Sequence, residues 1–307
     1  MLWDLFKREP KPFDEGYLPE RDGHAIYYYQ YGNPQGIPVL SFHGGPGGSS
    51  RPKYAKMFNL KKYRFIQFDQ RGCGMSQFND LFYRNETSNT ILDALRLLEY
   101  LKIETRLILH GVSWGSTLTL LFAEAQPQMI SNIVISSIFL ARPEDYGWVN
   151  KESERFYPDL WHEMRQQVRR NDIYKEYHNL MFSPRIKDNL KALSYLGSYE
   201  YQLGQLAPHL CELEEASPEQ IKSAQIAFYY DQNEYFISRN QILENSAKIK
   251  DIPTLIYHNR MDFCCPVKQA WDLHQALPKS ELTILPDYGH STPHLLKEMS
   301  KKLRNWL

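Results

Sequence analysis

The sequence predicts an α/β fold in which a mostly parallel sheet is flanked by helices and interrupted by a helical insertion. Three observations predict it: short apolar runs that end in turn residues, helical patterns that alternate with them, and one long polar segment without a convincing buried strand. Strands that alternate with helices favour parallel pairing through right-handed crossovers. The 307 residues suffice for one large domain with an insertion or for two smaller domains.

The first part of the chain carries five expected strands and two expected helices. The strand patterns lie at 24–33 (HAIYYYQYGN), 37–43 (IPVLSFH), 63–69 (YRFIQFD), 106–112 (RLILHGV) and 131–137 (SNIVISS). Helical patterns at 87–103 and 116–127 separate the last three of them, and Thr or Ser opens the first helix. We expect these strands to lie in one sheet.

The segment from 142 to 247 differs from both of its flanks. It is polar, rich in aromatic residues and mostly helical, with its clearest helical patterns at 152–170 and 218–236. We expect it to form a helical cap domain.

The strand pattern returns after this insertion. Strands are expected at 252–259 and 281–287, with a helix at 268–277 between them. Because late strands need a sheet to join, we expect a single core domain made of 1–141 and 248–307.

The overall composition argues against several classes of partner. Lys plus Arg and Asp plus Glu number 36 each, and the sequence pI is about 7.1. This balance disfavours a nucleic-acid partner and an anionic membrane surface. No run approaches the roughly 18 uninterrupted apolar residues of a spanning helix. The first 16 residues lack the apolar core of an export signal, so export is not expected.

The cysteines fit a reducing environment. Cys73, Cys211, Cys264 and Cys265 form neither a convincing disulfide framework nor a zinc-ligand spacing. We therefore expect a cytoplasmic protein. The sequence does not predict an oligomeric state.

A serine lies between two glycines where a strand pattern gives way to a helix pattern. The stretch Gly111-Val112-Ser113-Trp114-Gly115 fits a nucleophile elbow, in which a strained turn holds the serine hydroxyl out. An ordinary loop is the alternative, since a chance match arises in roughly one chain of this length in ten.

A serine nucleophile needs a histidine to accept its proton and a carboxylate to orient that histidine. In folds with an elbow the partners follow in the order Ser, acid, His, at the ends of later strands. Asp262 and His290 meet this requirement. Taken singly, Asp262 would more often be a turn or helix cap, and His290 a surface residue.

The early strand at 37–43 runs into a glycine-rich turn, Gly44 to Gly48. Backbone N–H groups of Gly44 or Gly45, with that of Trp114, are expected to face an oxygen that becomes negative during the reaction. The alternative is that the glycine-rich turn is only a tight connection without a role in the reaction. A phosphate-binding loop is disfavoured, because no Gly-Lys-Ser/Thr follows.

The stretch Asp69 to Ser76 (DQRGCGMS) contains a rival nucleophile, Cys73. No histidine lies near Cys73 in sequence, so we interpret the stretch as a structural turn in which Asp69 and Arg71 tie neighbouring loops together. Cys264 and Cys265 come just after Asp262, and we expect them to pack beside this loop and not to take part in the reaction.

Five motifs in this order and spacing, HGGPGG, DQRGCGMS, GVSWGS, RMDFCCP and YGHS, resemble the prolyl aminopeptidase (proline iminopeptidase) family of α/β-hydrolases. The resemblance implies an α/β-hydrolase fold with a helical cap over the active site. It implies release of an N-terminal proline without a metal or cofactor, with Ser113 as nucleophile, Asp262 as orienting acid and His290 as general base.

The family also holds the substrate's amino group with cap glutamates, and here the match is partial. Glu200 follows Tyr199 where the family has a Trp-Glu pair, whereas Ala227 stands where it has a second glutamate. Asp231, one helical turn later, could occupy the same face. Phe139 resembles an apolar residue of the family's proline pocket, with ordinary core packing as the alternative, and Glu200 could equally be a solvated glutamate.

The sequence thus predicts a serine hydrolase that acts on short peptides or small amide or ester substrates. Two other functions stay open. One is an esterase or amidase that lost recognition of the amino group, as Ala227 suggests. The other is a binding protein without catalysis, which the ordered Ser113, Asp262 and His290 disfavour.

Overall fold

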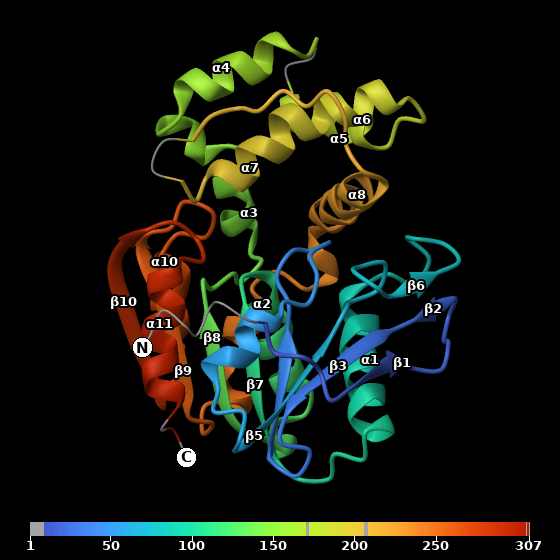
Figure 1. Cartoon of the computed structure of the whole chain (residues 1–307). Coiled ribbons are helices and arrows are strands. Elements are labelled where there is room, and N and C mark those ends of the chain that lie inside the picture. The colour runs from blue at the N-terminus through green and yellow to red at the C-terminus, as the bar shows by residue number, and fades with distance from the viewer. Residues whose placement is uncertain (1–8, 170–171, 206–207, 305, 307) are drawn as a thin grey trace.

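The computed structural model describes residues 9–169, 172–205, 208–304 and 306 (Figure 1). Residues 1–8, half of the segment in which no export signal is expected, lie outside this range, as does Arg170 at the end of the predicted helix 152–170. Within the described residues, no helix has the length and apolar character that a bilayer crossing requires.

An eight-stranded sheet in the order β1-β3-β5-β4-β7-β8-β9-β10 forms the centre of the molecule. Its strands are β1 (Asp14–Tyr17), β3 (Tyr27–Gly32), β4 (Ile37–Phe42), β5 (Tyr63–Phe68), β7 (Leu107–Val112), β8 (Ile130–Ser136), β9 (Thr254–Met261) and β10 (Ser280–Tyr288). Pairing is parallel from β5 to β10 and antiparallel at β1 and β3. The predicted mostly parallel sheet is confirmed.

The sequence analysis missed two details at the edge of this sheet. Strand β1 carries the sequence DEGY, which has no apolar run, because an edge strand needs little buried surface. The predicted strand 24–33 divides in two, and its first part, β2 (His24–Ala25), pairs instead with β6 (Gln77–Phe78).

Helices cover both faces of the sheet, because successive strand residues point to opposite faces. Along β7, Leu107 and Leu109 pack with α1 (Thr87–Tyr100), α2 (Trp114–Ala125) and α10 (Lys268–Ala276), whereas Ile108 packs on the other side with α11 (Pro293–Leu303) and the short helix η2 (Pro52–Met57). The five strands β5, β4, β7, β8 and β9 are therefore mostly buried on both faces, as expected of a parallel sheet, whereas the edge strand β10 is largely exposed.

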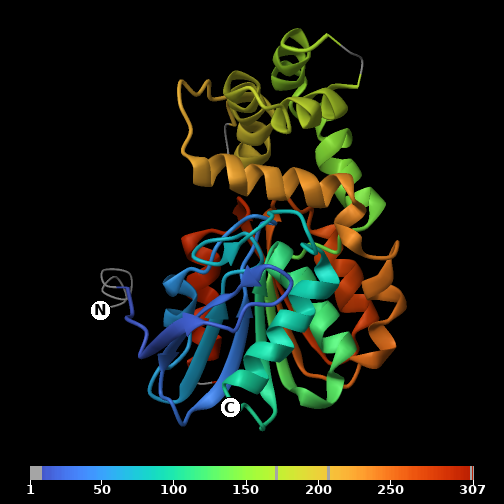
Figure 2. The ribbon, with the colours of Figure 1, turned by 90° about the vertical axis from the view of Figure 1, so that its right-hand side faces the viewer.

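A group of helices stands above the carboxyl ends of the strands (Figures 1 and 2). It contains α3 (Pro143–Asn150), α4 (Pro158–Gln166), α5 (Ile173–Met181), α6 (Ile186–Ala192), α7 (Ser198–Gln202) and α8 (Pro218–Gln232). These helices share an apolar core of their own around Trp161, Tyr177 and Tyr199. Helix α8 lies between that core and the sheet layer (Figure 2).

Short helical turns complete the chain. They are η3 (Pro127–Met129), η4 (Glu152–Arg155), η5 (Leu193–Gly197), η6 (Glu234–Phe236), α9 (Gln241–Glu244) and η7 (Ser246–Lys248). The predicted helix 152–170 breaks before Pro158, because proline has no N–H to continue a helix and starts α4 instead. The domain bounds 142 and 247 stay a prediction; α9, inside them, contacts α2 and α10.

The turn from β7 into α2 has no space for side chains at its two glycines. A Cβ at Gly111 would clash with the carbonyl oxygen of Gly115, and one at Gly115 would clash with the carbonyl oxygen of Phe42 in β4. Each clash involves backbone atoms, which cannot move aside without shifting a strand. The glycines thus let α2 start directly against the sheet.

We expect Gly115→Ala to lower the free energy of unfolding by about 1–3 kcal/mol or more, because the added methyl overpacks a rigid contact. Gly147→Ala is the matched control. Gly147 lies in α3, and a Cβ there would meet nothing within 4 Å, so the same change should stabilise by up to about 1 kcal/mol. Denaturant unfolding measures both. Equal effects in the two variants would contradict this account of the turn.

Candidate active site

The three residues predicted to form a catalytic triad each follow the carboxyl end of a parallel strand. Ser113 follows β7, Asp262 follows β9, and His290 comes two residues after β10. Because β7, β8, β9 and β10 are neighbours in the sheet, their ends bring these residues to one edge, beneath the helical cap. All three positions belong to this one region, although they span 178 residues of sequence.

Ser113 has a backbone conformation that non-glycine residues rarely adopt. Its φ is 58° and its ψ is −130°, and its N–H donates to the carbonyl oxygen of Ser136 at 3.1 Å. Within the described residues, its hydroxyl makes no hydrogen bond to His290. Such a bond is commonly long before substrate binds. The strained turn exposes the hydroxyl to the cavity below the cap.

The buried Asp262 pairs with the partly exposed His290. The Nδ1 atom of His290 lies 2.8 Å from Oδ2 of Asp262, while Oδ1 accepts the backbone N–H groups of Cys264 and Cys265 at 3.0 Å each. Burial lowers the pKa of His290, but the charge and hydrogen bond of Asp262 raise it, with a net rise. Burial raises the pKa of Asp262, and His290 lowers it, with a net fall. The geometry therefore favours an ionised carboxylate that orients the imidazole.

The loop that carries His290 is held from below. The Asn259 side chain donates to the carbonyl oxygen of Gly289 at 2.8 Å, and the Ser137 hydroxyl donates to that of His290. Gly289 has a φ of 92°, and a Cβ there would lie 2.7 Å from the carbonyl oxygen of Gly204 in the cap. Strand ends from the core and a cap residue thus fix the histidine together.

A fully buried histidine, His258, lies beside the pair and was not singled out from the sequence. Its Nδ1 accepts the N–H of Ile138 at 3.0 Å, so its proton lies on Nε2, which donates to the carbonyl oxygen of Cys265 at 2.7 Å. Burial lowers its pKa. His258 is thus neutral and holds the loop that positions Asp262. A histidine within a strand gives no sequence signal for this role.

The glycine-rich turn predicted to supply oxyanion donors lies against the elbow. A Cβ at Gly44 would lie 3.0 Å from the carbonyl oxygen of Val112 and 3.3 Å from Cβ of Ser113. Gly45 has a φ of 138°. Trp114 is the first residue of α2, where backbone N–H groups lack a partner within the helix. These N–H groups stay the proposed oxyanion donors.

A hydrogen-bond network joins this turn to the elbow. Gln70 donates its backbone N–H to Nε2 of His43 at 3.0 Å and its side-chain amide to the carbonyl oxygen of His43 at 2.9 Å. The indole N–H of Trp114 donates to Oε1 of Gln70 at 3.1 Å. With Nε2 accepting, the His43 proton lies on Nδ1 and is donated to the carbonyl oxygen of Gly44 at 2.8 Å. The network links three loops that are far apart in sequence.

The stretch 69–76 has the structural role that its sequence predicts. The carboxylate of Asp69 accepts the N–H groups of Ser50 and Met75 at 2.7 and 2.9 Å, and Arg71 forms a buried ion pair with Asp93 at 2.6 Å. Cys73 is buried, which raises its pKa to about 12. A thiol that stays protonated is no nucleophile, so the structure argues against Cys73.

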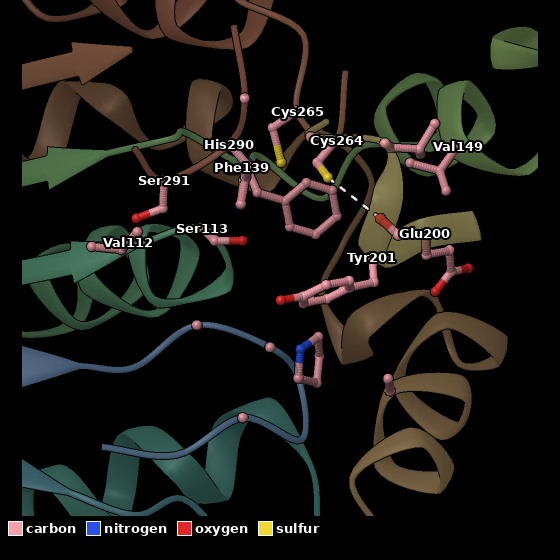
Figure 3. A pocket seen from close by; sticks show the side chains of 18 of the residues that line it. Val112, Ser113, Phe139, Val149, Glu200, Tyr201, Cys264, Cys265, His290 and Ser291 are labelled. Carbon is pink, nitrogen blue, oxygen red and sulfur yellow. Dashed lines mark hydrogen bonds between the residues drawn. The ribbon is translucent and has the colours of Figure 1, made fainter. Parts of the chain in front are cut away.

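A cavity of about 990 Å³ lies between the sheet edge and the cap. Core residues Ser113 and His290 line it from one side, and Glu200, Ala227 and Asp231 line it from the cap. In Figure 3 the ring of Phe139 lies between Ser113 and Glu200. The cavity is thus lined by Ser113, His290, Phe139, Glu200 and Asp231, while Asp262 lies behind His290 and outside the cavity wall.

Phe139 is held at the head of α2. Its N–H donates to the hydroxyl of Ser116 at 3.1 Å, its carbonyl oxygen accepts from Thr117 at 2.6 Å, and its ring lies 5.0 Å from that of Tyr235. With only 8% of its surface exposed, it is at once a core residue and part of the cavity wall.

The cap side of the cavity carries two acids. Tyr174 donates to Oε1 of Glu200 at 3.2 Å, and the Asp231 carboxylate accepts from Asn150 at 3.3 Å and lies 3.4 Å from Nε2 of His178. Burial and the charge of Asp231 raise the pKa of Glu200 to about 8, against the hydrogen bond of Tyr174. The two acids are thus close enough to oppose each other's ionisation, a situation that a bound cation would relieve.

One group of potential metal ligands exists among the described residues. Ligand atoms of Asp262, Cys264 and His290 lie within 4.8 Å of one another. Both oxygens of Asp262 already accept hydrogen bonds, one of them paired with His290. Binding of an ion by these three residues would therefore break the hydrogen bond between Asp262 and His290.

Comparisons with known proteins agree with the fold. The alpha/beta hydrolase fold family matches residues 37–294. A proline iminopeptidase of Arabidopsis thaliana is 34% identical over 292 residues, 92% of this chain and 76% of that protein. One from Xylella fastidiosa (strain Temecula1 / ATCC 700964) is 35% identical over 299 residues, 92% of each. The solved α/β fold family hydrolase of Bacillus anthracis str. Sterne, 17% identical, covers 94% of this chain and 99% of its own with a TM-score of 0.62, which shows the fold alone.

We expect Asp262→Asn to lower the pKa of His290. The substitution removes the charge that raises this pKa and leaves the burial that lowers it. The pH dependence of the imidazole proton resonances, measured by NMR, gives the value directly. Asp287→Asn is the control, since Asp287 pairs with His294 instead. A His290 pKa that is the same in Asp262→Asn as in the unmodified protein would refute the pairing.

Proposed function

The chain belongs to the proline iminopeptidase family of α/β-hydrolases, and on that premise we propose that it releases N-terminal proline from short peptides through an acyl-enzyme on Ser113. One observation carries the proposal: a strained serine and a histidine paired with the buried Asp262 line a cavity whose cap side carries two acids. The serine, the histidine and its aspartate suit acyl transfer, and the two acids suit a substrate with a free amino group.

The proposed reaction begins at Ser113. His290 accepts the hydroxyl proton at Nε2, because its Nδ1 is hydrogen-bonded to Asp262. The serine oxygen then attacks the carbonyl carbon of the proline residue. The carbonyl oxygen becomes negative and is stabilised by N–H groups of Gly44 or Gly45 and of Trp114. The imidazolium of His290 then protonates the leaving amine as the peptide bond breaks. Water, deprotonated by His290, releases proline from the serine ester.

Recognition of the amino group is assigned to Glu200 and Asp231. The secondary ammonium of an N-terminal proline would replace the proton that the raised pKa of Glu200 favours, so Glu200 can ionise in the complex. A substrate with a blocked amino group would leave the acids without a counter-charge. The penalty for an unpaired buried charge then produces specificity for free N-termini.

The esterase alternative depends on Ala227. Ala227 lines the cavity, so the position that carries a glutamate in the family is here apolar. Asp231 lines the same cavity one helical turn later and interacts electrostatically with Glu200. Because a second acid is present, loss of amino-group recognition is disfavoured. Phe139 is proposed to contact the proline ring from the core side.

We expect a fluorophosphonate to label Ser113 covalently, and Ser113→Ala to lower kcat on proline arylamides by about 10⁴-fold or more while the fold is kept. Mass spectrometry of the labelled peptide identifies the site. Ser238→Ala, which changes an exposed serine outside the cavity wall, is a control that keeps the nucleophile. Labelling at Cys73, or unchanged turnover in Ser113→Ala, would refute the assignment.

We expect binding of L-prolinol, an uncleavable amine, to release about one proton at pH 7, because Glu200 with a pKa of about 8 must ionise to pair with the ammonium. Below pH 8 this ionisation opposes binding, so affinity should rise from pH 6 to pH 8 and then level off. Calorimetry in buffers of different ionisation enthalpy counts the protons.

Two variants check the residue assignment. Glu200→Gln should release almost no proton and weaken binding roughly ten- to a hundred-fold, the worth of a charged hydrogen bond. Glu212→Gln is the matched control, since this cap glutamate accepts a hydrogen bond from Tyr195 and does not line the cavity. Equal proton release in Glu200→Gln and the unmodified enzyme would overturn the role of Glu200.

A further inference from the structure

We infer that the cavity contains a second charged subsite, formed by Arg51 and Lys53, that binds the free carboxylate of the residue leaving with the new amino group. The inference rests on the proposed function and narrows its substrates to short peptides with a free C-terminus. Glu200 and Asp231 approach the cavity from the cap, whereas Arg51 and Lys53 approach it from the core, on the connection after β4.

Both cations lie on the side of the cavity that carries His290. Arg51 caps the start of η2, and Lys53 lies in its first turn, with Nζ 5.2 Å from the centre of the Tyr54 ring. Burial raises the pKa of Tyr54, and the Ser291 hydroxyl and the Arg51 charge lower it, so both groups lie near its phenol oxygen. Ser291 follows His290 directly. The basic pair therefore adjoins the residue that protonates the leaving amine.

Neither cation has a counter-charge within the described part of the chain. No ion pair joins Arg51 or Lys53 to a carboxylate among the described residues, although Lys53 is half-buried. Burial and the charge of Arg51 lower the pKa of Lys53. Asp287 also lines the cavity, but its carboxylate pairs with His294. Two like charges near each other in a cavity wall are unfavourable unless an anion joins them.

A shielded hydroxyl lies next to this pair. Ser291 lines the cavity, and its Oγ, which is shielded from solvent, lies near the phenol oxygen of Tyr54. Because a hydroxyl can both accept and donate a hydrogen bond, that of Ser291 can accept from Tyr54 and donate to an oxygen of a ligand. Arg51 contributes a planar fork of N–H groups and Lys53 a point charge, a combination that suits a carboxylate.

The chemistry of the reaction explains why a carboxylate belongs at this place. In a dipeptide the leaving nitrogen and the carboxylate belong to one residue, so the carboxylate must lie near the group that protonates the nitrogen. The cavity then matches a zwitterion: acids for its ammonium on the cap side and cations for its carboxylate on the core side. Peptidases that shorten longer chains to such fragments would supply the substrate.

The test compares prolylglycine with prolylglycinamide, which differ only in the carboxylate. The measured quantity is the ratio of their kcat/KM values at low ionic strength. We expect Arg51→Gln with Lys53→Gln to lower this ratio about tenfold relative to the unmodified enzyme, mostly through KM, because a half-exposed charged contact is lost. The single variants Arg51→Gln and Lys53→Gln should give ratios between those of the double variant and the unmodified enzyme. Raising the salt concentration should also lower the ratio of the unmodified enzyme.

Lys56→Gln is the matched control, because Lys56 lies on the same short helix but not in the cavity wall, and its ratio should equal that of the unmodified enzyme. Lys53→Glu, checked for folding by circular dichroism, should lower the ratio beyond Lys53→Gln by repulsion. An unchanged ratio in the double variant and in Lys53→Glu would overturn the inference. Failure of the unmodified enzyme on both peptides and on proline arylamides would instead overturn the proposed function.

Discussion

The close approach of β7 and α2 at Ser113 is the constraint on which the rest of the site depends. Gly111 and Gly115 remove the side chains that would hold strand and helix apart, and the positive φ of Ser113 then turns its hydroxyl out of the backbone. The other groups are placed relative to this point by the parallel order of the strands, whose carboxyl ends form one edge. Strain at a single residue is tolerated because the sheet and α2 are rigid around it.

Much of the site could be predicted because its signals are local. An elbow, a glycine-rich turn and strand ends in a required order are all legible within a few residues, and they are enough to locate Ser113, Gly44, Asp262 and His290. What escaped prediction depends on contacts between distant segments. His258 holds the acid loop, and Gln70 joins His43 to Trp114, but neither has a local pattern that distinguishes it from an ordinary core residue.

The electrostatic design of the cavity cannot be predicted from the sequence alone. The net charge of zero hides a separation in which Glu200 and Asp231 come from the cap and Arg51 and Lys53 from the core. The pKa of Glu200 is high because the fold buries it and brings Asp231 near, and these two residues lie on different helices. The sequence spacing suggested that Asp231 replaces the glutamate that the family has at the position of Ala227. The electrostatic interaction between Asp231 and Glu200, however, depends on the fold.

Helix α8 rests directly on the glycine-rich turn of the core. The Ser223 hydroxyl donates to the carbonyl oxygen of Gly47 at 2.7 Å, and a Cβ at Gly47 would clash with the backbone of Ser223. The same helix carries Asp231. A displacement of α8 would therefore disturb two proposed sites together, the turn with the proposed oxyanion donors and the acid proposed to bind the substrate ammonium. The position of one helix thus couples the binding of the substrate to the stabilisation of the reacting carbonyl oxygen in the proposed mechanism.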